Sequence, residues 1–432
     1  MKGRLIVLFS SFITIVAPLA AQDLQYFFVD DVYQRSYINP ALNNEKTVML
    51  ASGLSTNIGT DGPVYNDLIS KNDDGRIILD SEKGLASMNA QNNIFGGATV
   101  HTIDASVDLK VFRVSAGHAW KANGFLQYSK DLAEIATYGN APYIGQTKAI
   151  GPAYEYTNYN EIYIGIQKYV GPVSIGARVK RLSGVQAIQT ANRKIDITTD
   201  EEFYALQVES DYTVNSAGTL DYFELDSFDI STQKFSFDHF MSGNGGWAFD
   251  VGASFDLGDR LELSLGILDL GSITWDKDAK TLKSKKNQTF DGIDLTSYIG
   301  TDDDILVEDS IRALLDFEET SGAFSSTLPS QMYLGARLQL SDMWTVGALL
   351  HTTNYQEKTR MALALNATTK WKILRLGVQY TARSEGFFNI GLNGALHIGP
   401  VIGFLTADNI LAIPDPFGVK YASFRAGVSV SL

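Results

Sequence analysis

Residues 247–275 read WAFDVGASFDLGDRLELSLGILDLGSITW, and they predict two β-strands joined by a tight turn. Up to Leu257, large apolar residues alternate with small or polar ones, which is the period-two pattern of a strand. Gly258-Asp259 is a typical hairpin turn. The second strand alternates from Leu261 to Ile267-Leu268, where the pattern slips by one residue and indicates a bulge. Each strand has about ten residues, enough to cross a bilayer at about 45°.

The same alternation recurs along most of the chain and predicts 14 strands, give or take two. It is most regular in the last hundred residues. A helix of one or two turns is expected at 131–138. The expected strands lie at 95–109, 111–125, 148–157, 160–169, 172–183, 247–257, 261–275, 332–340, 344–351, 360–365, 374–380, 388–397, 400–409 and 421–432.

Three features favour a membrane-spanning barrel over a soluble, exported all-β protein. The strands are longer than the five or six residues that are usual in globular sheets. Their polar faces are rich in Gly, Ser and charged residues. Short turns gather on one side, whereas long loops at 185–246 and 276–329 lie on the other, as in bacterial barrels. The exception is 126–147, which the strand count places with the short turns. We therefore expect a closed antiparallel transmembrane β-barrel with two long extracellular loops.

The N-terminus has the pattern of a secretory signal peptide. Lys2 and Arg4 precede an apolar stretch, and small residues follow, so cleavage is expected before Gln22. A membrane anchor is the alternative, but the stretch is short for a span. Residues 1–21 are thus the expected signal peptide, 22–94 a plug segment with loop, and 95–432 the barrel, which places the protein in the cell outer membrane.

Composition narrows the function. The chain has 432 residues, no Cys and a formal net charge of −14. The acidic charge disfavours nucleic acid as a partner. The absence of Cys excludes disulfides, thiol catalysis and Cys-based metal sites. No later stretch approaches 20 continuous apolar residues, so no transmembrane helix is expected.

No catalytic or metal-binding pattern stands out. The five His have no metal-ligand spacing, and no Gly-x-Ser-x-Gly elbow occurs. Asp302-Asp303-Asp304 offers oxygen ligands but lacks the spacing of a calcium loop, so a solvated acidic loop is favoured. We expect no enzyme, no metal and no cofactor. A hydrolase with a Ser–His pair across strands is the alternative.

Charged residues on the polar strand faces would point into the lumen. They either form the ion pairs of a filled barrel, which we favour, or line a gated polar path with Asn39, Pro40 and Ala41 at the gate. The candidates are Arg113, Arg178, Lys180, Arg337, Arg375, Arg425, Asp104, Asp108, Glu161 and Asp250.

Several short motifs resemble one family. Asn39-Pro40-Ala41, ahead of the first long strand, matches the NPA element of FadL-type outer-membrane transporters. Asp250-Val-Gly, the stretch 268–275 (LDLGSITW) and the stretch 328–335 (LPSQMYLG) resemble FadL-like barrels of Bacteroidota, including the PorV and PorP types and a related group of unknown function. The resemblance covers most of the mature chain. The chain departs from it in two acidic insertions and in ending on Leu432 rather than an aromatic residue.

The resemblance implies a 14-stranded barrel whose N-terminal segment plugs the lumen. FadL-type members move hydrophobic molecules inward, so the first expectation is passage of a hydrophobic small molecule. PorV-type members shuttle cargo in type IX secretion, so the alternative is a non-transporting docking or accessory barrel. The expected partners are outer-membrane lipid and either a hydrophobic ligand or a secretion-system or surface protein. Transport predicts an apolar pocket with a lateral or N-terminal opening, whereas docking predicts a plugged lumen and ordered outer loops.

Overall fold

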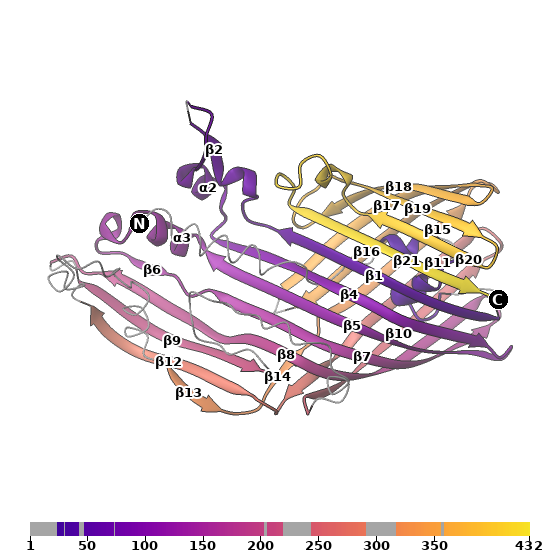
Figure 1. Cartoon of the computed structure of the whole chain (residues 1–432), viewed down its shortest axis with the longest axis horizontal. Coiled ribbons are helices and arrows are strands. Elements are labelled where there is room, and N and C mark those ends of the chain that lie inside the picture. The colour runs from indigo at the N-terminus through magenta and orange to yellow at the C-terminus, as the bar shows by residue number, and fades with distance from the viewer. Residues whose placement is uncertain are drawn as a thin grey trace.

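The computed structural model of the chain describes residues 24–29, 31–42, 47–72, 74–202, 205–218, 243–290, 317–355 and 358–432. Within them, fourteen antiparallel strands close into one barrel (Figure 1). Closure is complete because β1 pairs with both β4 and β21. The predicted fold class is confirmed. Around the wall the strands are β1 (Val48–Thr60), β4 (Gln91–Asp108), β5 (Phe112–Ser129), β7 (Ala153–Val170), β8 (Val173–Thr199), β10 (Gly245–Leu257), β11 (Leu261–Trp275), β15 (Ser330–Gln339), β16 (Trp344–Tyr355), β17 (Lys358–Trp371), β18 (Leu374–Arg383), β19 (Asn389–Ile398), β20 (Val401–Ala407) and β21 (Tyr421–Ser431).

The strand count agrees with the prediction only because two errors cancel. The barrel begins at Val48 and not at residue 95, since β1 is a full wall strand. Its Ser, Thr, Asn and Gly residues resemble loop composition, although Leu54 and Ile58 keep the alternation on its outer face. The strands expected at 148–157 and 160–169 are one strand, β7, because its polar residues interrupt the apolar pattern without ending the strand.

The two ends of the barrel differ, as predicted. The turn end carries the tight turns, for example Gly171-Pro172 and Gly258-Asp259, and Val48 there hydrogen-bonds Leu432 beside it. The loop end carries the long connections. Because β1 precedes β4 in the wall, the connection from β5 to β7, which includes residues 130–147, lies at the loop end. The prediction that 126–147 lies among the short turns is therefore wrong.

The helix predicted at 131–138 is present as α3 (Lys130–Tyr138). It begins at Ser129, whose hydroxyl accepts a hydrogen bond from the Leu132 amide at 3.1 Å. Beyond the membrane-spanning part, Lys148 lies 2.7 Å from Glu134 and 3.0 Å from Asp131. The hydrogen bond to Glu134 raises the pKa of the Lys148 ammonium. These contacts hold α3 against β6 (Thr147–Ala149).

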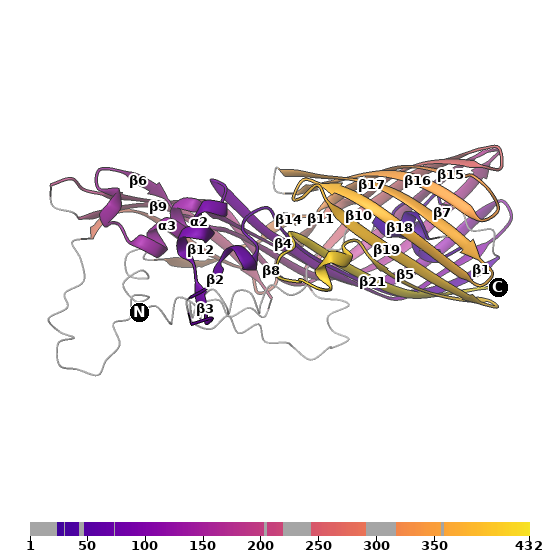
Figure 2. The same cartoon turned by 90° about the horizontal axis from the view of Figure 1, so that it is seen from above.

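The two long loops are partly regular sheet. β8 continues to Thr199 and pairs there with β9 (Leu206–Ala217), which pairs in turn with β12 (Lys280–Phe290). With β13 (Glu318–Ser321), these strands form an outer sheet that extends past the loop end (Figure 2). The sequence predicts a long loop over 185–246 that could contain its own hairpin, and β8 and β9 form such a hairpin there. In 276–329 it predicts no strand, so β12 and β13 correct that prediction. β9 alternates, but it has too few apolar residues to stand out in the sequence.

The remaining elements are short. None of the helices in the described ranges is long and apolar enough to cross a membrane. The expected signal peptide and residues 302–316 of the acidic stretch lie outside the described residues. The short elements are η1 (Leu24–Phe27), η2 (Tyr33–Tyr37), η3 (Tyr65–Asp67), β2 (Ile69–Lys71), β3 (Ile77–Leu79), α2 (Ser81–Ser87), η4 (Ala141–Tyr143), β6 (Thr147–Ala149), β14 (Phe324–Thr327) and η7 (Ile410–Ala412).

The outer wall of the barrel is apolar. Large aliphatic and aromatic side chains point outward around the wall, and Ile164 is 66% exposed. So much contiguous apolar surface is unfavourable in water and is matched by lipid. We therefore treat the barrel as membrane-spanning. Further exposed members are Leu54, Ile166, Ile175, Phe249, Leu265, Leu334, Leu363, Val378, Leu392, Leu405 and Phe424.

A charge on this lipid-facing wall is expected to destabilise the barrel. Val378 lies near the middle of β18 and faces outward, so Val378→Lys should cost about 2–4 kcal/mol of unfolding free energy. Urea unfolding in lipid vesicles measures it. Asn287→Lys, at an exposed position of β12 in the outer sheet, is the control and should have little effect. Equal effects would contradict the membrane placement.

Candidate functional site

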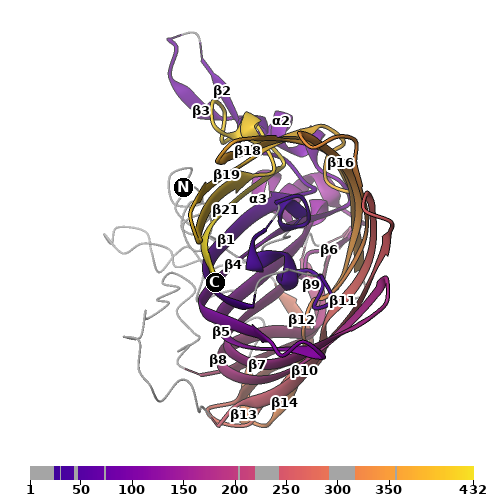
Figure 3. The ribbon, with the colours of Figure 1, turned by 90° about the vertical axis from the view of Figure 1, so that its right-hand side faces the viewer.

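The N-terminal segment, residues 24–29 and 31–42, lies inside the turn half of the barrel (Figure 3). Leu24, Tyr26 and Phe27 are fully buried. They form one apolar core with inward-facing wall residues such as Leu349 and Phe404. The lumen of the turn half is therefore filled with side chains.

Polar contacts also fix the N-terminal segment to the wall. The Gln34 amide donates to the Ser52 and Val428 carbonyls, both at 3.0 Å, and accepts from the Ser429 hydroxyl at 2.6 Å. Arg35 pairs with Glu262 of β11. Because these groups are buried or half-buried, losing them would leave polar atoms unsatisfied.

Asn39-Pro40-Ala41 ends the N-terminal segment against the wall. The Asn39 side chain donates to the Ala253 carbonyl at 3.0 Å and accepts from the Ala41 amide at 2.8 Å. The Ala41 carbonyl accepts from Gln167 at 2.8 Å and Ser254 at 3.2 Å. The Gln167 and Ser254 side chains are buried on the lumen side, whereas Ala253 contributes only its backbone carbonyl.

Three glycines leave the space that this contact needs. Gly176, Gly252 and Gly266 are directly paired across β8, β10 and β11, and we call them the glycine seat. A Cβ added at these positions would overlap, respectively, the Pro40 carbonyl, the Asn39 side chain and the Ile38 carbonyl. Only glycine lets the segment approach the wall so closely.

A buried layer of tyrosines joins the N-terminal segment to the wall strands β4, β7 and β8. The Tyr37 and Tyr163 hydroxyls both donate to Asp104, and the Tyr33 hydroxyl lies 2.9 Å from that of Tyr163. The Arg178 guanidinium lies over the Tyr163 ring, 4.7 Å from its centroid. All five side chains are buried, and we call them the tyrosine layer.

Above this layer, toward the loop end, is the outer cavity. It holds about 1010 Å³ of empty space, part of it open to solvent. Phe95, Phe125 and Tyr355 line its mouth, and the Arg360 guanidinium lies 3.9 Å from the Phe95 ring centroid. Tyr163 belongs to its floor. The cavity thus has an aromatic mouth and a polar floor.

Five charged side chains on five successive wall strands form a network, most of which lies in that floor. Lys121 lies 2.9 Å from Glu161 and 3.4 Å from Asp269. Lys180 lies 2.8 Å from Asp250 and 2.6 Å from Asp269. Glu161, Lys180, Asp250 and Asp269 are buried, and the Lys121 side chain is 14% exposed, so each charge depends on its neighbours.

Asp269 enters this network because of the bulge predicted beside it, which is confirmed. The β10–β11 register shifts here, and Asp269 has a left-handed φ of 58°. The shift turns the Asp269 carboxylate inward. The alternation in the sequence did not identify Asp269 as a lumen residue. Lys121 could have been identified, because it lies on the same strand face as Arg113.

The other predicted lumen residues are scattered. Arg113 contacts Asp108 at 3.2 Å near the turn end. Arg337 lies 3.9 Å from Glu262, and Arg375 donates to the Lys372 carbonyl at 3.1 Å. They do not meet in one site.

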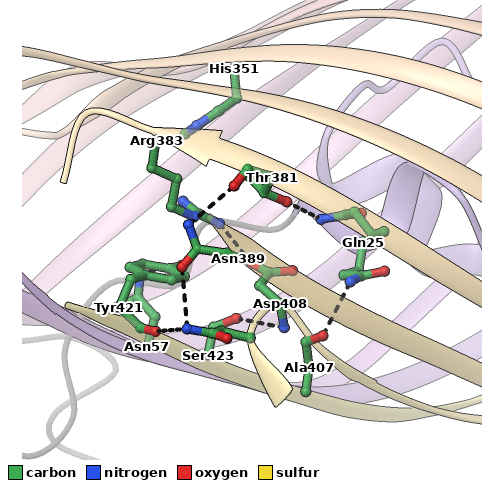
Figure 4. Close-up of polar contacts among 12 residues, drawn as sticks. Gln25, Asn57, His351, Thr381, Arg383, Asn389, Ala407, Asp408, Tyr421 and Ser423 are labelled. Atoms are coloured by element: carbon green, nitrogen blue, oxygen red, sulfur yellow. Dashed lines mark hydrogen bonds and ion pairs between the residues drawn. The ribbon is translucent and has the colours of Figure 1, made fainter. Parts of the chain in front are cut away.

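Arg425 belongs to a separate cluster with two residues that sequence reasoning missed, Arg383 and Asp408. Figure 4 shows Arg383 and Asp408 beside Tyr421. Asp408 accepts from Arg383 at 2.9 Å and from Arg425 at 3.0 and 3.1 Å, and all three side chains are fully buried. Arg383 also covers the Tyr421 ring at 3.7 Å. Asp408 follows the end of β20, where alternation gives no signal.

A smaller inner cavity lies toward the turn end, and its empty space of about 330 Å³ is partly open to solvent. Tyr33, Pro40, Arg113, Gln167 and Arg178 belong to its lining. In the described part of the chain, no group of three or more His, Asp or Glu side chains is placed to hold a metal ion.

A model described as "Family of unknown function (DUF5723)" matches residues 40–408. The chain matches no curated protein. Among solved structures it is similar to the Pseudomonas putida toluene transporter TodX, with 10% identity, coverage of 92% of this chain and 93% of that one, and a TM-score of 0.44. A Pseudomonas aeruginosa FadL homologue has 12% identity, coverage of 91% and 92%, and a TM-score of 0.43. The Ralstonia pickettii toluene transporter TbuX has 9% identity, coverage of 90% and 91%, and a TM-score of 0.43.

These sequence identities and TM-scores are too low to support an argument about the function of this chain. The barrel fold that the FadL-like resemblance implied is confirmed by this chain's own strands. The resemblance to PorV- and PorP-type barrels stays a prediction. The function must be argued from this chain's own residues.

Proposed function

The chain belongs to the DUF5723 family, whose function is unknown, and we propose that it is an outer-membrane barrel that passes a small hydrophobic molecule. The outer cavity is the observation that carries this proposal. Its lining combines aromatic rings with a few polar and charged side chains, which is the mixture that small-molecule sites use. The protein is proposed to act as a transporter and not as an enzyme.

The lining of the outer cavity suggests what the molecule looks like. Phe95, Phe125 and Tyr355 offer ring surface at the mouth, which favours an apolar or aromatic body. Lys121 and Glu161 in the floor offer charged hydrogen-bonding groups of both signs. A hydrophobic molecule that also carries a polar group fits both regions.

The N-terminal segment is the proposed closure of the path. It fills the turn half of the lumen, and Asn39, Pro40 and Ala41 anchor it on the glycine seat. Under this proposal the lumen charges outside both cavity linings, such as Arg337 and Arg375, are structural ion pairs.

Filling the outer cavity is expected to expel the ligand. Thr353 is half-buried in the cavity wall, so Thr353→Trp should place an indole in the space that a ligand would use. We expect the amount of retained ligand to fall about fivefold, the factor that corresponds to about 1 kcal/mol. Mass spectrometry of small molecules that co-purify with the detergent-extracted protein measures it.

The matched control is Thr359→Trp, at an exposed position outside the cavity lining, which should retain the ligand. The variant Asn39→Ala/Pro40→Ala should alter the ligand content if the N-terminal segment closes the path. A wild-type barrel that carries no small molecule would count against transport.

The outer sheet favours a second candidate function, a docking barrel for a secretion-system or surface protein. The lumen is filled at the turn end, and β9, β12 and β13 present ordered strands beyond the barrel. Lys285 is well exposed on this sheet. A photo-reactive residue at position 285 that cross-links one defined protein in cells, together with a ligand-free barrel, would support docking over transport.

A further inference from the structure

The outer and inner cavities lie on opposite sides of the tyrosine layer. Tyr355 and Arg360, at the loop ends of β16 and β17, line the outer cavity. Arg113 and Gln167, near the turn ends of β5 and β7, line the inner cavity. Arg178 lines both. One buried layer therefore separates a space that opens toward the loop end from one that lies toward the turn end.

The contacts within the layer are few compared with those of the whole N-terminal segment. Tyr163 belongs to the outer lining and Tyr33 to the inner lining, and one hydroxyl contact of 2.9 Å joins them. Removing the segment from the lumen would instead break its apolar core and the hydrogen bonds of Gln34 and Asn39. Opening the layer disrupts far fewer buried contacts.

Two wall glycines make room for this layer. A Cβ at Gly117 would overlap the Asp104 carboxylate and lie 2.7 Å from the Tyr163 ring. A Cβ at Gly165 would lie 2.9 Å from the Arg178 side chain. The wall is thus shaped around the layer's side chains.

We propose that the tyrosine layer is the gate of the barrel. The path runs from the outer cavity past Arg178, between Tyr33 and Tyr163, into the inner cavity. It opens by movement of these side chains while Asn39-Pro40-Ala41 stays on the glycine seat. The inference deepens the proposed transport function and rests on it for its physiological meaning, but the route itself is tested without a substrate.

Truncating a layer side chain should open the path to small ions. The full-length protein is reconstituted in planar bilayers in potassium chloride, and conductance per barrel is recorded. Tyr163→Ala should raise the conductance several-fold over that of wild type. The matched control is Tyr421→Ala, another buried tyrosine that points inward from the wall but lies outside both cavity linings, and it should conduct as wild type does.

A second variant tests the gate even if Tyr163→Ala does not fold. Tyr33 belongs to the N-terminal segment and not to the wall, so Tyr33→Ala leaves the wall strands unchanged. It should raise the conductance in the same way. The heat-dependent gel migration of folded barrels identifies which preparations are folded. A wild-type conductance in both folded variants, or an equal rise in Tyr421→Ala, would overturn the gate.

A reversible tether distinguishes gate opening from loss of the whole segment. The chain has no Cys, and a Cβ at Gly252 points at the Asn39 side chain, so Asn39→Cys/Gly252→Cys should form a disulfide on oxidation. In the Tyr163→Ala background, the raised conductance should persist when the tether is closed. If oxidation abolishes it and reduction restores it, the segment itself must leave and the proposed gate is wrong.

These results separate the two proposals. If the layer variants conduct as expected but the barrel carries no ligand, the gate is supported and the transport of a small molecule is contradicted. If Thr353→Trp loses a ligand but the layer variants do not raise the conductance, transport is supported and the route through the tyrosine layer is contradicted.

Discussion

Asp408→Asn is expected to lower the free energy of unfolding by about 3–5 kcal/mol. Asp408 is fully buried between Arg383 and Arg425, which also have no solvent-exposed side-chain surface. Removing its charge leaves two guanidinium groups close together in the barrel wall with no carboxylate between them. Their mutual repulsion and their lost hydration both favour the unfolded state.

Urea unfolding in lipid vesicles, followed by tryptophan fluorescence, gives this free energy. Asp415→Asn is the control, because Asp415 lies in the same 408–420 connection but is exposed, and its carboxylate accepts from the Asn66 side-chain amide at 3.1 Å. Its effect should stay within about 0.5 kcal/mol. Similar values for the two variants would show that the buried cluster is not a main source of stability.

Gly252→Val is expected to displace the end of the N-terminal segment. A Cβ at Gly252 overlaps the Asn39 side chain and lies 3.0 Å from Pro40, so the wall and the segment cannot keep their present contact. The hydrogen bond from Asn39 to Ala253 would be lost as well. An Ala41→Cys reporter, buried in the wild type, should then react with a maleimide at least about tenfold faster, which corresponds to about 1.4 kcal/mol.

The maleimide can label only the introduced cysteine, because the chain contains no other thiol. Gly403→Val is the matched control, since the nearest atom to a Cβ at Gly403 is 4.0 Å away, in the Val428 side chain. It should leave the labelling rate of Ala41→Cys unchanged. Unchanged labelling in Gly252→Val would mean that the glycine seat does not hold the segment in place.

Sequence pattern predicted the barrel wall wherever lipid and lumen impose strict alternation. It predicted β10, β11 and the strands after residue 330, because outward apolar residues such as Phe249 and Leu334 alternate there with small or polar ones. It failed on β1 and on the outer sheet. The outer sheet extends past the barrel and has a weak apolar face. β1 keeps apolar residues on its outer face, but its Ser, Thr, Asn and Gly residues resemble the composition of a loop.

The same reasoning explains which site residues could be predicted. Arg178 and Asp250 lie on regular strands, so their position in the alternation placed them on the lumen side. Asp269 depends on a bulge, and Asp408 follows the end of a strand, so no periodic signal reaches them. The seat contacts depend on tertiary packing of Asn39 against Gly252, which local pattern cannot encode.

Gln34 has a consequence for how the molecule is assembled. It contacts Ser52 of the first wall strand and Val428 of the last, from which it is 394 residues distant in sequence. Joining these strands completes the ring only after the entire chain has been delivered, and such distant contacts are slow to form. The Gln34 side chain, which belongs to the N-terminal segment inside the lumen, bridges β1 and β21. The pairing of these two strands and the insertion of the segment are therefore expected to occur together in one late step. A chain missing residues 24–42 should therefore accumulate as an incompletely joined intermediate.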